Sequence, residues 1–365
     1  MAYSTIKDPS AYFQTALWTG NNATGNQITN DGNSDLKPDF IWAKARTSTS
    51  YTDNYFIVDS SRGRLKGLVT NDTSAETTTT GNESQQAERD LESFDTDGFT
   101  VGIVNSTAAL NASSASNVAW QWKVNGGTTT SLSSNINSVC QVNQDAGISI
   151  VKYTCTGGGN GQAVQHGLGL VPQVIITKNR TDNSYSDWIT YHHSIGYTNF
   201  LKLNTTAASA GSSPYNGAEP TSSTYNVSID LVESTKDYVS YVFAPIQGYS
   251  HFGSYLGNGN GDGPMIYTGF KPAFVMIKPT SYVEEWVIID AKRDPYNQAM
   301  LQLKANSNGA EYNGASVTNG IDILSNGFKV RTSRTELNTS KGSLIYMAFA
   351  ENPFVTSTGV PATAR

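Results

Sequence analysis

One pattern of large apolar residues occurs three times along the chain. Its copies are residues 38–44 (PDFIWAK), 172–178 (PQVIITK) and 272–278 (PAFVMIK), each with a proline, one variable residue, three apolar residues, one further residue and a lysine. The apolar run is continuous rather than alternating, so it predicts a strand that is buried on both faces. Proline has no amide donor and is tolerated where a strand begins, so we expect each proline to open its strand.

Each copy continues with further strand candidates at similar spacing. A second strand is predicted at 54–59, 187–192 and 285–290, and an aromatic closing strand at 118–123, 238–243 and 344–349. A turn at Asp97-Gly98-Phe99 has its counterpart at Asn326-Gly327-Phe328, whereas the middle copy has only residues 225–229 in that place. With six or seven strand candidates per copy, the sequence predicts an all-β fold of three tandem repeats, each a lectin-like (jelly-roll or concanavalin-like) β-sandwich.

The period of roughly a hundred residues is too long for a solenoid repeat or a propeller blade, so each copy is predicted to be a domain. The expected boundaries are 1–130, 131–248 and 249–355, followed by a short tail at 356–365. Tryptophan can stack on sugars, but at repeated strand positions it is more often core. The residues predicted to form the repeat cores are Phe40, Trp42, Trp122, Ile176, Trp188, Phe243, Phe274, Trp286 and Phe349.

Composition narrows the functional classes. Only 15% of the residues are charged and the net charge is -6, so polarity comes from Ser, Thr, Asn and Gly. Nucleic acid is an unexpected partner, because its recognition needs a dense basic surface. No stretch approaches the ~20 apolar residues of a membrane helix, and no signal-peptide pattern is present, so we expect no membrane insertion and synthesis in a cytoplasm.

The candidates for chemistry are few, and we expect no catalytic residue, cofactor or metal ligand. His192 and His193 are adjacent on a predicted strand, where neighbouring side chains point to opposite faces, so their rings should diverge. Glycoside hydrolysis needs two carboxylates across one cleft. No such pair is visible within a single repeat among the candidates Asp59, Asp95, Asp97, Glu284, Glu285 and Asp290.

Three further features have two interpretations each. Cys140 and Cys155 could bridge neighbouring strands, although free thiols are favoured. The segment 257–263 (GNGNGDG) could suggest phosphate or calcium, but it has no Lys-Ser ending and a single carboxylate, so a turn is favoured. The polar stretches 70–88 and 205–224 are long loops, which either carry a binding surface or are simply irregular.

Four segments together carry a resemblance to a known family. They are 11–20 (AYFQTALWTG), 94–102 (FDTDGFTVG), 118–123 (VAWQWK) and 346–354 (YMAFAENPF). As a set they resemble uncharacterised repeat proteins from tailed bacteriophages of marine bacteria and cyanobacteria. The familiar version often has Cys between the two tryptophans, where this chain has Gln121.

The resemblance implies a virion protein that is assembled in the host cytoplasm and is not an enzyme. The first expectation is a tail fibre or receptor-binding adhesin that contacts a host-surface glycan or protein through loops. The alternatives are a capsid decoration or tail scaffold with only virion partners, and a glycan depolymerase. By analogy with fibres we expect a homo-oligomer, with a trimer favoured.

Overall fold

The fold consists almost entirely of antiparallel strands. The computed structural model describes residues 4–49, 53–78, 91–103, 110–157, 159, 161–182, 186–211, 214–215, 218–228, 231, 233–314 and 319–355. The predicted tail and parts of the two long loops fall outside these ranges. The described helical segments are short, namely α2 (Thr335–Asn338) and the 3-10 turns η1 (Pro9–Ala11), η2 (Asn125–Gly127) and η3 (His193–Ile195). In the described part of the chain, no helix has the length and apolar character needed to cross a membrane.

Three large sheets share one strand order. The first runs β1 (Phe13–Thr19), β9 (Ser116–Trp122), β3 (Phe40–Ala45), β4 (Phe56–Asp59), β5 (Lys66–Val69), β6 (Thr77–Thr78). The second runs β12 (Ile148–Thr154), β19 (Asp237–Phe243), β14 (Val174–Asn179), β15 (Ile189–His192), β16 (Asn199–Lys202), β17 (Ala210–Gly211), and adds β10 (Thr130–Leu132) and β11 (Ser138–Asn143) beside β12. The third runs β20 (Ser250–Leu256), β28 (Ser343–Pro353), β22 (Phe270–Pro279), β23 (Val287–Asp290), β24 (Leu301–Lys304), β25 (Tyr312–Asn313).

A small sheet accompanies each large one, and we call each such pair of sheets a sandwich. The first small sheet comprises β2 (Asn26–Ile28), β8 (Phe99–Val101) and β7 (Leu91–Phe94), and the third comprises β21 (Met265–Tyr267), β27 (Gly327–Val330) and β26 (Ile321–Leu324). The second has β13 (Gln162–Gln165) and β18 (Thr224–Val227). The turn before β8 needs glycine, because Gly98 has φ +92° and a Cβ there would lie 2.0 Å from the Ile28 carbonyl oxygen.

The predicted role of the prolines is right for two strands and wrong for the third. β3 and β14 begin two residues after Pro38 and Pro172. β22 begins earlier, at Phe270, so Pro272 lies inside this strand. The register against β28 shifts on both sides of Pro272, and such an irregularity accommodates a residue that has no amide donor.

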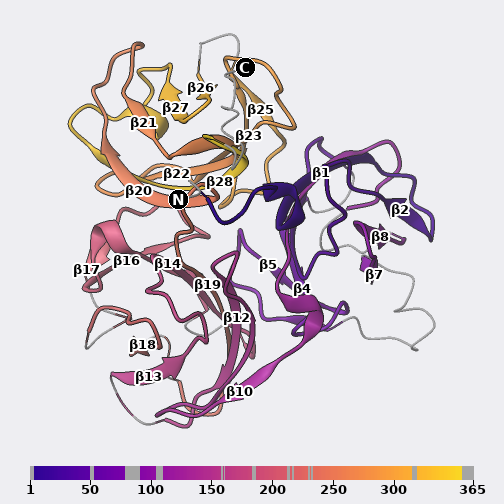
Figure 1. Cartoon of the computed structure of the whole chain (residues 1–365), viewed down its shortest axis with the longest axis vertical. Helices are drawn as coiled ribbons and strands as arrows, with labels where there is room; N and C mark the ends of the chain where they lie inside the picture. Colours follow the sequence, from indigo (N-terminus) through magenta and orange to yellow (C-terminus); the bar gives the residue numbers. More distant parts are fainter. Residues whose placement is uncertain are drawn as a thin grey trace.

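The central strands of each large sheet are buried on both faces, as the continuous apolar runs predict. The outer face of each packs in a separate cluster with its small sheet, for example Ile41 and Val58 with Phe99 in the first. The inner faces of all three meet in one central cluster of 33 buried residues. Figure 1 shows the resulting three lobes around a common centre, with the first third of the chain on the right, the middle third below and the last third above.

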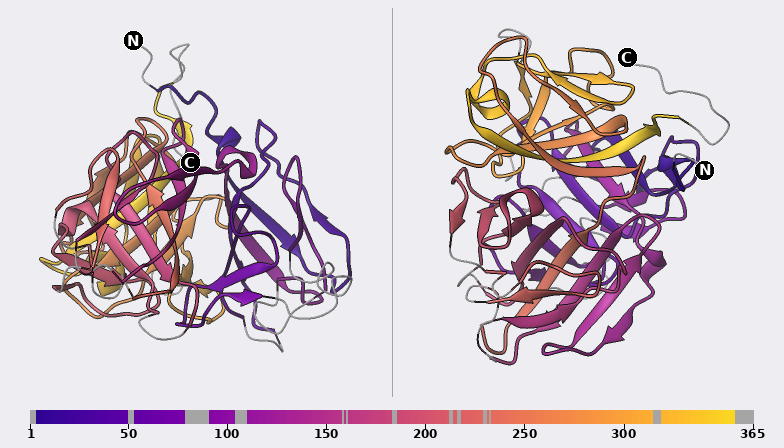
Figure 2. Two further views of the ribbon diagram at one scale, coloured as in Figure 1. Left: turned by 90° about the horizontal axis from the view of Figure 1, so that it is seen from below. Right: turned by 60° about the vertical axis from the view of Figure 1, so that its left-hand side comes forward.

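The two ends of this assembly differ. β9, β19 and β28 finish at one end, where the chain also passes from the first sandwich to the second (124–129) and from the second to the third (244–249). Ser4 lies at the same end and donates from Oγ to the Gln247 carbonyl (2.9 Å), and Gly248 packs against both Ser4 and Pro353. We call this the connection end; the N-terminal part is at the top in Figure 2, left. The opposite end, where β1, β12 and β20 finish, is the loop end.

Candidate functional site

All nine residues predicted as repeat cores lie in the central cluster. Their side chains are at most 4% exposed. The residues that finish β9, β19 and β28 contact one another, with ring centroids 6.4 Å apart for Trp122 and Phe243, 5.4 Å for Trp122 and Phe349, and 5.9 Å for Phe243 and Phe349. The predicted residues therefore pack between the three large sheets rather than inside each separate sandwich.

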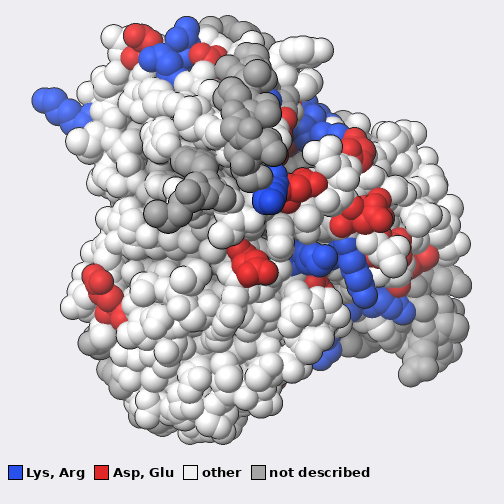
Figure 3. Space-filling model, viewed as in Figure 1, with Lys and Arg blue, Asp and Glu red and all other residues white. Residues whose placement is uncertain are grey.

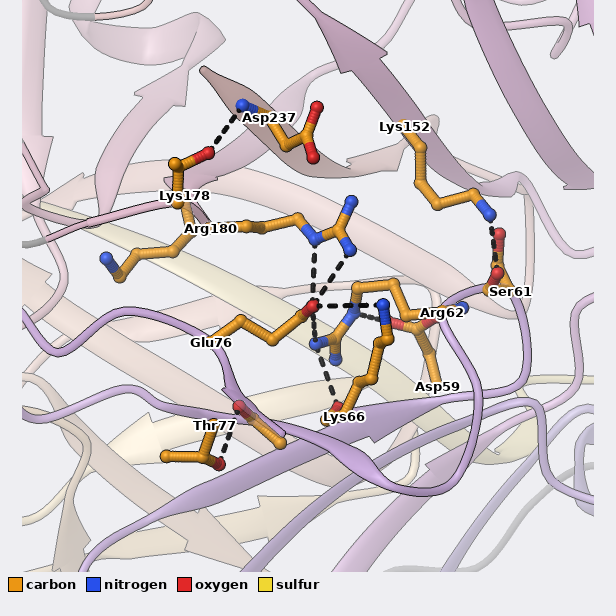
Figure 4. A network of polar contacts seen from close by, with 12 residues as sticks. Asp59, Ser61, Arg62, Lys66, Glu76, Thr77, Lys152, Lys178, Arg180 and Asp237 are labelled. Carbon is orange, nitrogen blue, oxygen red and sulfur yellow. Dashed lines mark hydrogen bonds and ion pairs between the residues drawn. The ribbon is translucent and has the colours of Figure 1, made fainter. Parts of the chain in front are cut away.

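A buried ionic network joins the first and second large sheets (Figure 4). Asp59 accepts hydrogen bonds from Arg62 Nε (2.5 Å) and Tyr241 Oη (2.8 Å). Glu76 bridges Arg62 Nη1 (2.9 Å) and Arg180 Nε (2.8 Å). Burial by itself would raise the pKa of Glu76, but the hydrogen bonds and charges of the two arginines outweigh it and lower that pKa to about 2.

The third and first large sheets meet through a matching network. Asp290 accepts from Arg293 Nε (2.5 Å) and Trp120 Nε1 (3.0 Å). Glu311 bridges Arg293 Nη1 (2.8 Å) and Arg46 Nη2 (2.8 Å). The register supports the match, because Asp59 is paired with Phe40 just as Asp290 is paired with Phe274.

Among the described residues, the second and third large sheets meet without such a network. His192, paired with Val174, stands where the other two have aspartate. Ile195 replaces the arginine three residues later, and Met347 replaces the Tyr241 or Trp120 donor. His192 instead hydrogen-bonds the backbone carbonyl of Tyr346 through Nε2 (3.2 Å).

The lysine that ends each copy of the apolar pattern crosses one of the three contacts between sheets. Each ammonium group donates to a backbone carbonyl in a loop of another sandwich: Lys44 to Asn308 (3.2 Å), Lys178 to Thr73 (3.3 Å) and Lys278 to Thr206 (3.1 Å). All three side chains are fully buried. Burial lowers the pKa of each to about 8.

The structure corrects the expectation for the histidine pair. The rings of His192 and His193 do not diverge; they stack with centroids 5.0 Å apart. The strand ends at His192 and His193 begins η3, so the alternation of a strand no longer applies between them.

The remaining candidates are the two cysteines and the glycine-rich segment. Cys140 and Cys155 are buried free thiols. Asp262, in the glycine-rich segment, pairs with Lys329 (2.9 Å); this segment leads from β20 to β21, so it links two sheets. Among the described residues, no group of three or more His, Cys, Asp or Glu side chains could hold a metal ion.

Two grooves of mixed polar and apolar lining open between the sandwiches. One of about 370 Å³ lies between the first and third, with Gln14, Asn33 and Asn352 on its walls and the ion pair of Lys292 and Asp31 beside them. A second of about 630 Å³ lies between the first and second. Its walls include Tyr12, Lys123, Asn143, Gln144 and Asp145. On the face seen in Figure 3 most of the surface is uncharged.

Exposed apolar side chains are concentrated on the last third of the chain. Of the ten described large apolar side chains that are exposed, three lie in the first two sandwiches (Ile103, Leu170, Val171) and seven in the third: Leu256, Met265, Tyr267, Tyr282, Val283, Tyr296 and Tyr312. Such side chains gathered on one part of a surface mark binding sites more often than single exposed residues do.

Three of these side chains form a cluster at the loop end. Leu256 (69% exposed) finishes β20, while Tyr282 (44%) and Val283 (71%) lie between β22 and β23. Both segments adjoin the start of β28, because the Gly342 carbonyl accepts from Gly257 N (2.9 Å) and the Ser343 carbonyl accepts from Thr280 N (2.9 Å). We call Leu256, Tyr282 and Val283 the apolar loop cluster. The repeated pattern did not point to it, since Tyr282 and Val283 lie between two of the repeated strands and Leu256 lies at the end of another.

Comparison with known proteins gives a family without a function. A family model described as a domain of unknown function, DUF7483, matches residues 8–353. The chain belongs to this family. No curated protein and no solved structure matches the chain.

Proposed function

We propose that the protein consists of three copies of one lectin-like β-sandwich, closed around a common centre. The shared strand order of the three large sheets supports this, as do the matching Asp–Arg–Glu networks and the three equivalent lysines. Trimerisation, expected from the resemblance, stays a prediction. The inner faces are already covered within one chain, so a trimer would have to use outer surfaces.

We further propose that the protein is a non-enzymatic virion protein, a tail-fibre component or receptor-binding adhesin. It contacts a host-surface glycan or protein through the apolar loop cluster. The observation that carries this proposal is the concentration of exposed apolar side chains on the third sandwich. The viral setting rests on the sequence resemblance to phage repeat proteins.

The chemistry of the cluster suits such a contact. Tyrosine offers a large, rigid surface with a polar hydroxyl and is enriched in binding surfaces. The neighbouring Asn258, Asn260 and Asp262 provide amide and carboxylate groups in an exposed turn. The cluster lies opposite the connection end, so both passages between sandwiches stay clear of a bound partner.

A binding experiment tests this proposal. The purified chain, fluorescently labelled, is titrated onto host cells beside a variant carrying Leu256→Ser, Tyr282→Ser and Val283→Ser. The matched control is Leu170→Ser with Val171→Ser, which removes exposed apolar side chains from the second sandwich. We expect at least tenfold weaker binding for the cluster variant and unchanged binding for the control. Equal binding by all three proteins, or none by the wild type, would contradict the proposal.

The second candidate is a capsid decoration or tail scaffold that binds only virion proteins. The connection end favours it, because both passages between sandwiches lie there and present exposed residues at 125–130 and Gln247. Pull-down of assembled capsids by the chain, unaffected by the cluster variant, would support this candidate over the adhesin.

A further inference from the structure

Three of the four histidines gather where the second and third large sheets meet. His192 and His193 stack at the end of β15, and His251 on β20 faces them across the contact. Tyr346 on β28 lies between the two sides: its carbonyl accepts from His192 Nε2 (3.2 Å) and its hydroxyl is 2.8 Å from His251 Nδ1. His193 Nε2 also lies 3.0 Å from the Phe252 carbonyl.

The hydrogen bonds of His192 require a neutral ring. Its Nδ1 accepts from the Ser194 amide (3.2 Å), so the proton belongs on Nε2, which faces the Tyr346 carbonyl. A second proton, on Nδ1, would place an N–H opposite the Ser194 N–H, so this hydrogen bond would be lost. At His251 the Tyr346 hydroxyl can either donate to Nδ1 or accept from it, so this hydrogen bond survives protonation and the acid sensitivity rests on His192.

No charged side chain of the described residues is placed to accommodate a protonated His192 ring. The ionisable groups facing His192 are His193 on η3, His251 on β20 and Tyr346 on β28. The other side chains around it are uncharged: Val174, Thr190, Met276, Trp286, Ile345 and Met347. Within the described ranges no carboxylate forms an ion pair with any histidine, whereas the other two contacts hold Asp–Arg pairs with fully buried side chains.

We propose that this cluster makes the contact between the second and third large sheets an acid-sensitive joint, which loosens below about pH 6 while the other two contacts hold. The proposal does not depend on the ligand or on the viral setting.

The direction of the effect follows from the burial of His192. Burial and the neighbouring His193 lower the pKa of His192 to about 3. Between the ordinary value near 6.5 and that lowered value, the unfolded or opened state binds more protons than the closed state. Stability of the contact is therefore full above pH 6.5 and is lost as the pH falls. At pH 5, a single histidine that stays neutral in the closed state and is protonated in the opened state raises the equilibrium constant for opening about 30-fold.

Hydrogen exchange of the full chain, followed by mass spectrometry at pH 7.5 and pH 5.0 with intrinsic rates corrected, tests the proposal. We expect protection in 189–195, 250–256 and 343–349 to fall at least tenfold at pH 5.0. Protection in 56–62 and 287–293, at the two Asp–Arg contacts, should change less than twofold. Equal loss at all three contacts, or no loss at the histidine contact, would overturn the proposal.

Two variants separate His192 from other acid effects. His192→Gln retains an acceptor and a donor in place of the two ring nitrogens, so it should keep its protection at pH 5.0. The matched control is His166→Gln, because His166 is also buried, accepts from Leu168 N and faces the Thr221 carbonyl, but lies far from the contact. It should leave the acid loss at the contact unchanged.

A third variant remains informative even if His192→Gln does not fold. His192→Asp with Ile195→Arg introduces the residue pair found at the other two contacts, and it should make all three contacts respond alike between pH 7.5 and 5.0. An acid loss at the histidine contact that persists in this variant would contradict the role given to His192.

Discussion

Glu76 stabilises the contact between the first and second large sheets, and the free energy that it contributes can be measured with one substitution. In Glu76→Gln the side chain keeps its shape and loses its charge. Arg180 then loses its carboxylate partner, and Arg62, whose side chain is fully buried, keeps Asp59 as its carboxylate partner. The change leaves two guanidinium groups less compensated where the first and second sheets meet.

The expected cost can be worked out in two ways. The pKa of Glu76 falls from 4.5 to about 2, and at 1.36 kcal/mol per unit this corresponds to about 3 kcal/mol of stability at neutral pH. Removing one partner of a buried ion pair costs about 3–5 kcal/mol in other proteins. Both routes give a loss of about 3 kcal/mol.

Urea unfolding at pH 7, analysed by linear extrapolation, measures this loss. The control is Asp322→Asn, which removes a partly exposed pair with Arg331 (3.4 Å) and should cost less than about 1 kcal/mol. The contribution of Glu76 is present above pH 4.5 and lost as the pH falls toward 2, so the difference between wild type and Glu76→Gln should shrink over that range. A difference below 1 kcal/mol at pH 7, or one that does not change with pH, would refute the reasoning.

Three further predictions follow from buried groups. Trp188→Ala or Trp286→Ala should each destabilise the chain by about 3–5 kcal/mol in the same urea assay; a variant with unchanged stability but lost cell binding would show that the residue is not core. Burial holds the pKa of Lys44, Lys178 and Lys278 at about 8, against about 10.5 in the unfolded chain. The free energy of unfolding should therefore rise by about 1 kcal/mol per lysine from pH 7.5 to 9. The triple Lys→Met variant should lack this rise. Burial raises the pKa of Cys140 to about 11, so this thiol should resist alkylation at pH 8 in the folded chain. Rapid labelling after denaturation is the positive control, and equally rapid labelling of the folded chain would contradict the prediction.

Much of the fold could be predicted from the sequence because burial leaves a local signature. The continuous apolar run at 172–178 predicts a strand covered on both faces, and β14 is buried along its whole length. The sequence could not reveal what covers the inner face of each large sheet, because an apolar pattern shows that a strand is buried but not which element it packs against. That partner is the inner face of two other sheets, formed by residues about a hundred positions away.

The polar contacts were harder to predict for a similar reason. Asp59 and Asp290 recur at one position of the pattern, and an arginine follows each three residues later, which was a visible signal of a paired site. Glu76 and Glu311 lie outside the repeated pattern, so the two glutamates could not be matched to each other from their spacing. The stacked His192 and His193 were predicted wrongly because the end of β15 could not be located to the residue from the sequence.

The central functional claim is that the chain is displayed on a virus particle with its loop end facing outward. Two Fab fragments, one against the apolar loop cluster and one against the exposed residues 125–130 of the connection end, can be compared by immunogold electron microscopy of intact particles. Both must first bind the isolated chain equally well. We predict that the loop-end Fab labels the tail and the connection-end Fab does not. Labelling by the connection-end Fab alone, or no labelling by either, would contradict the claim.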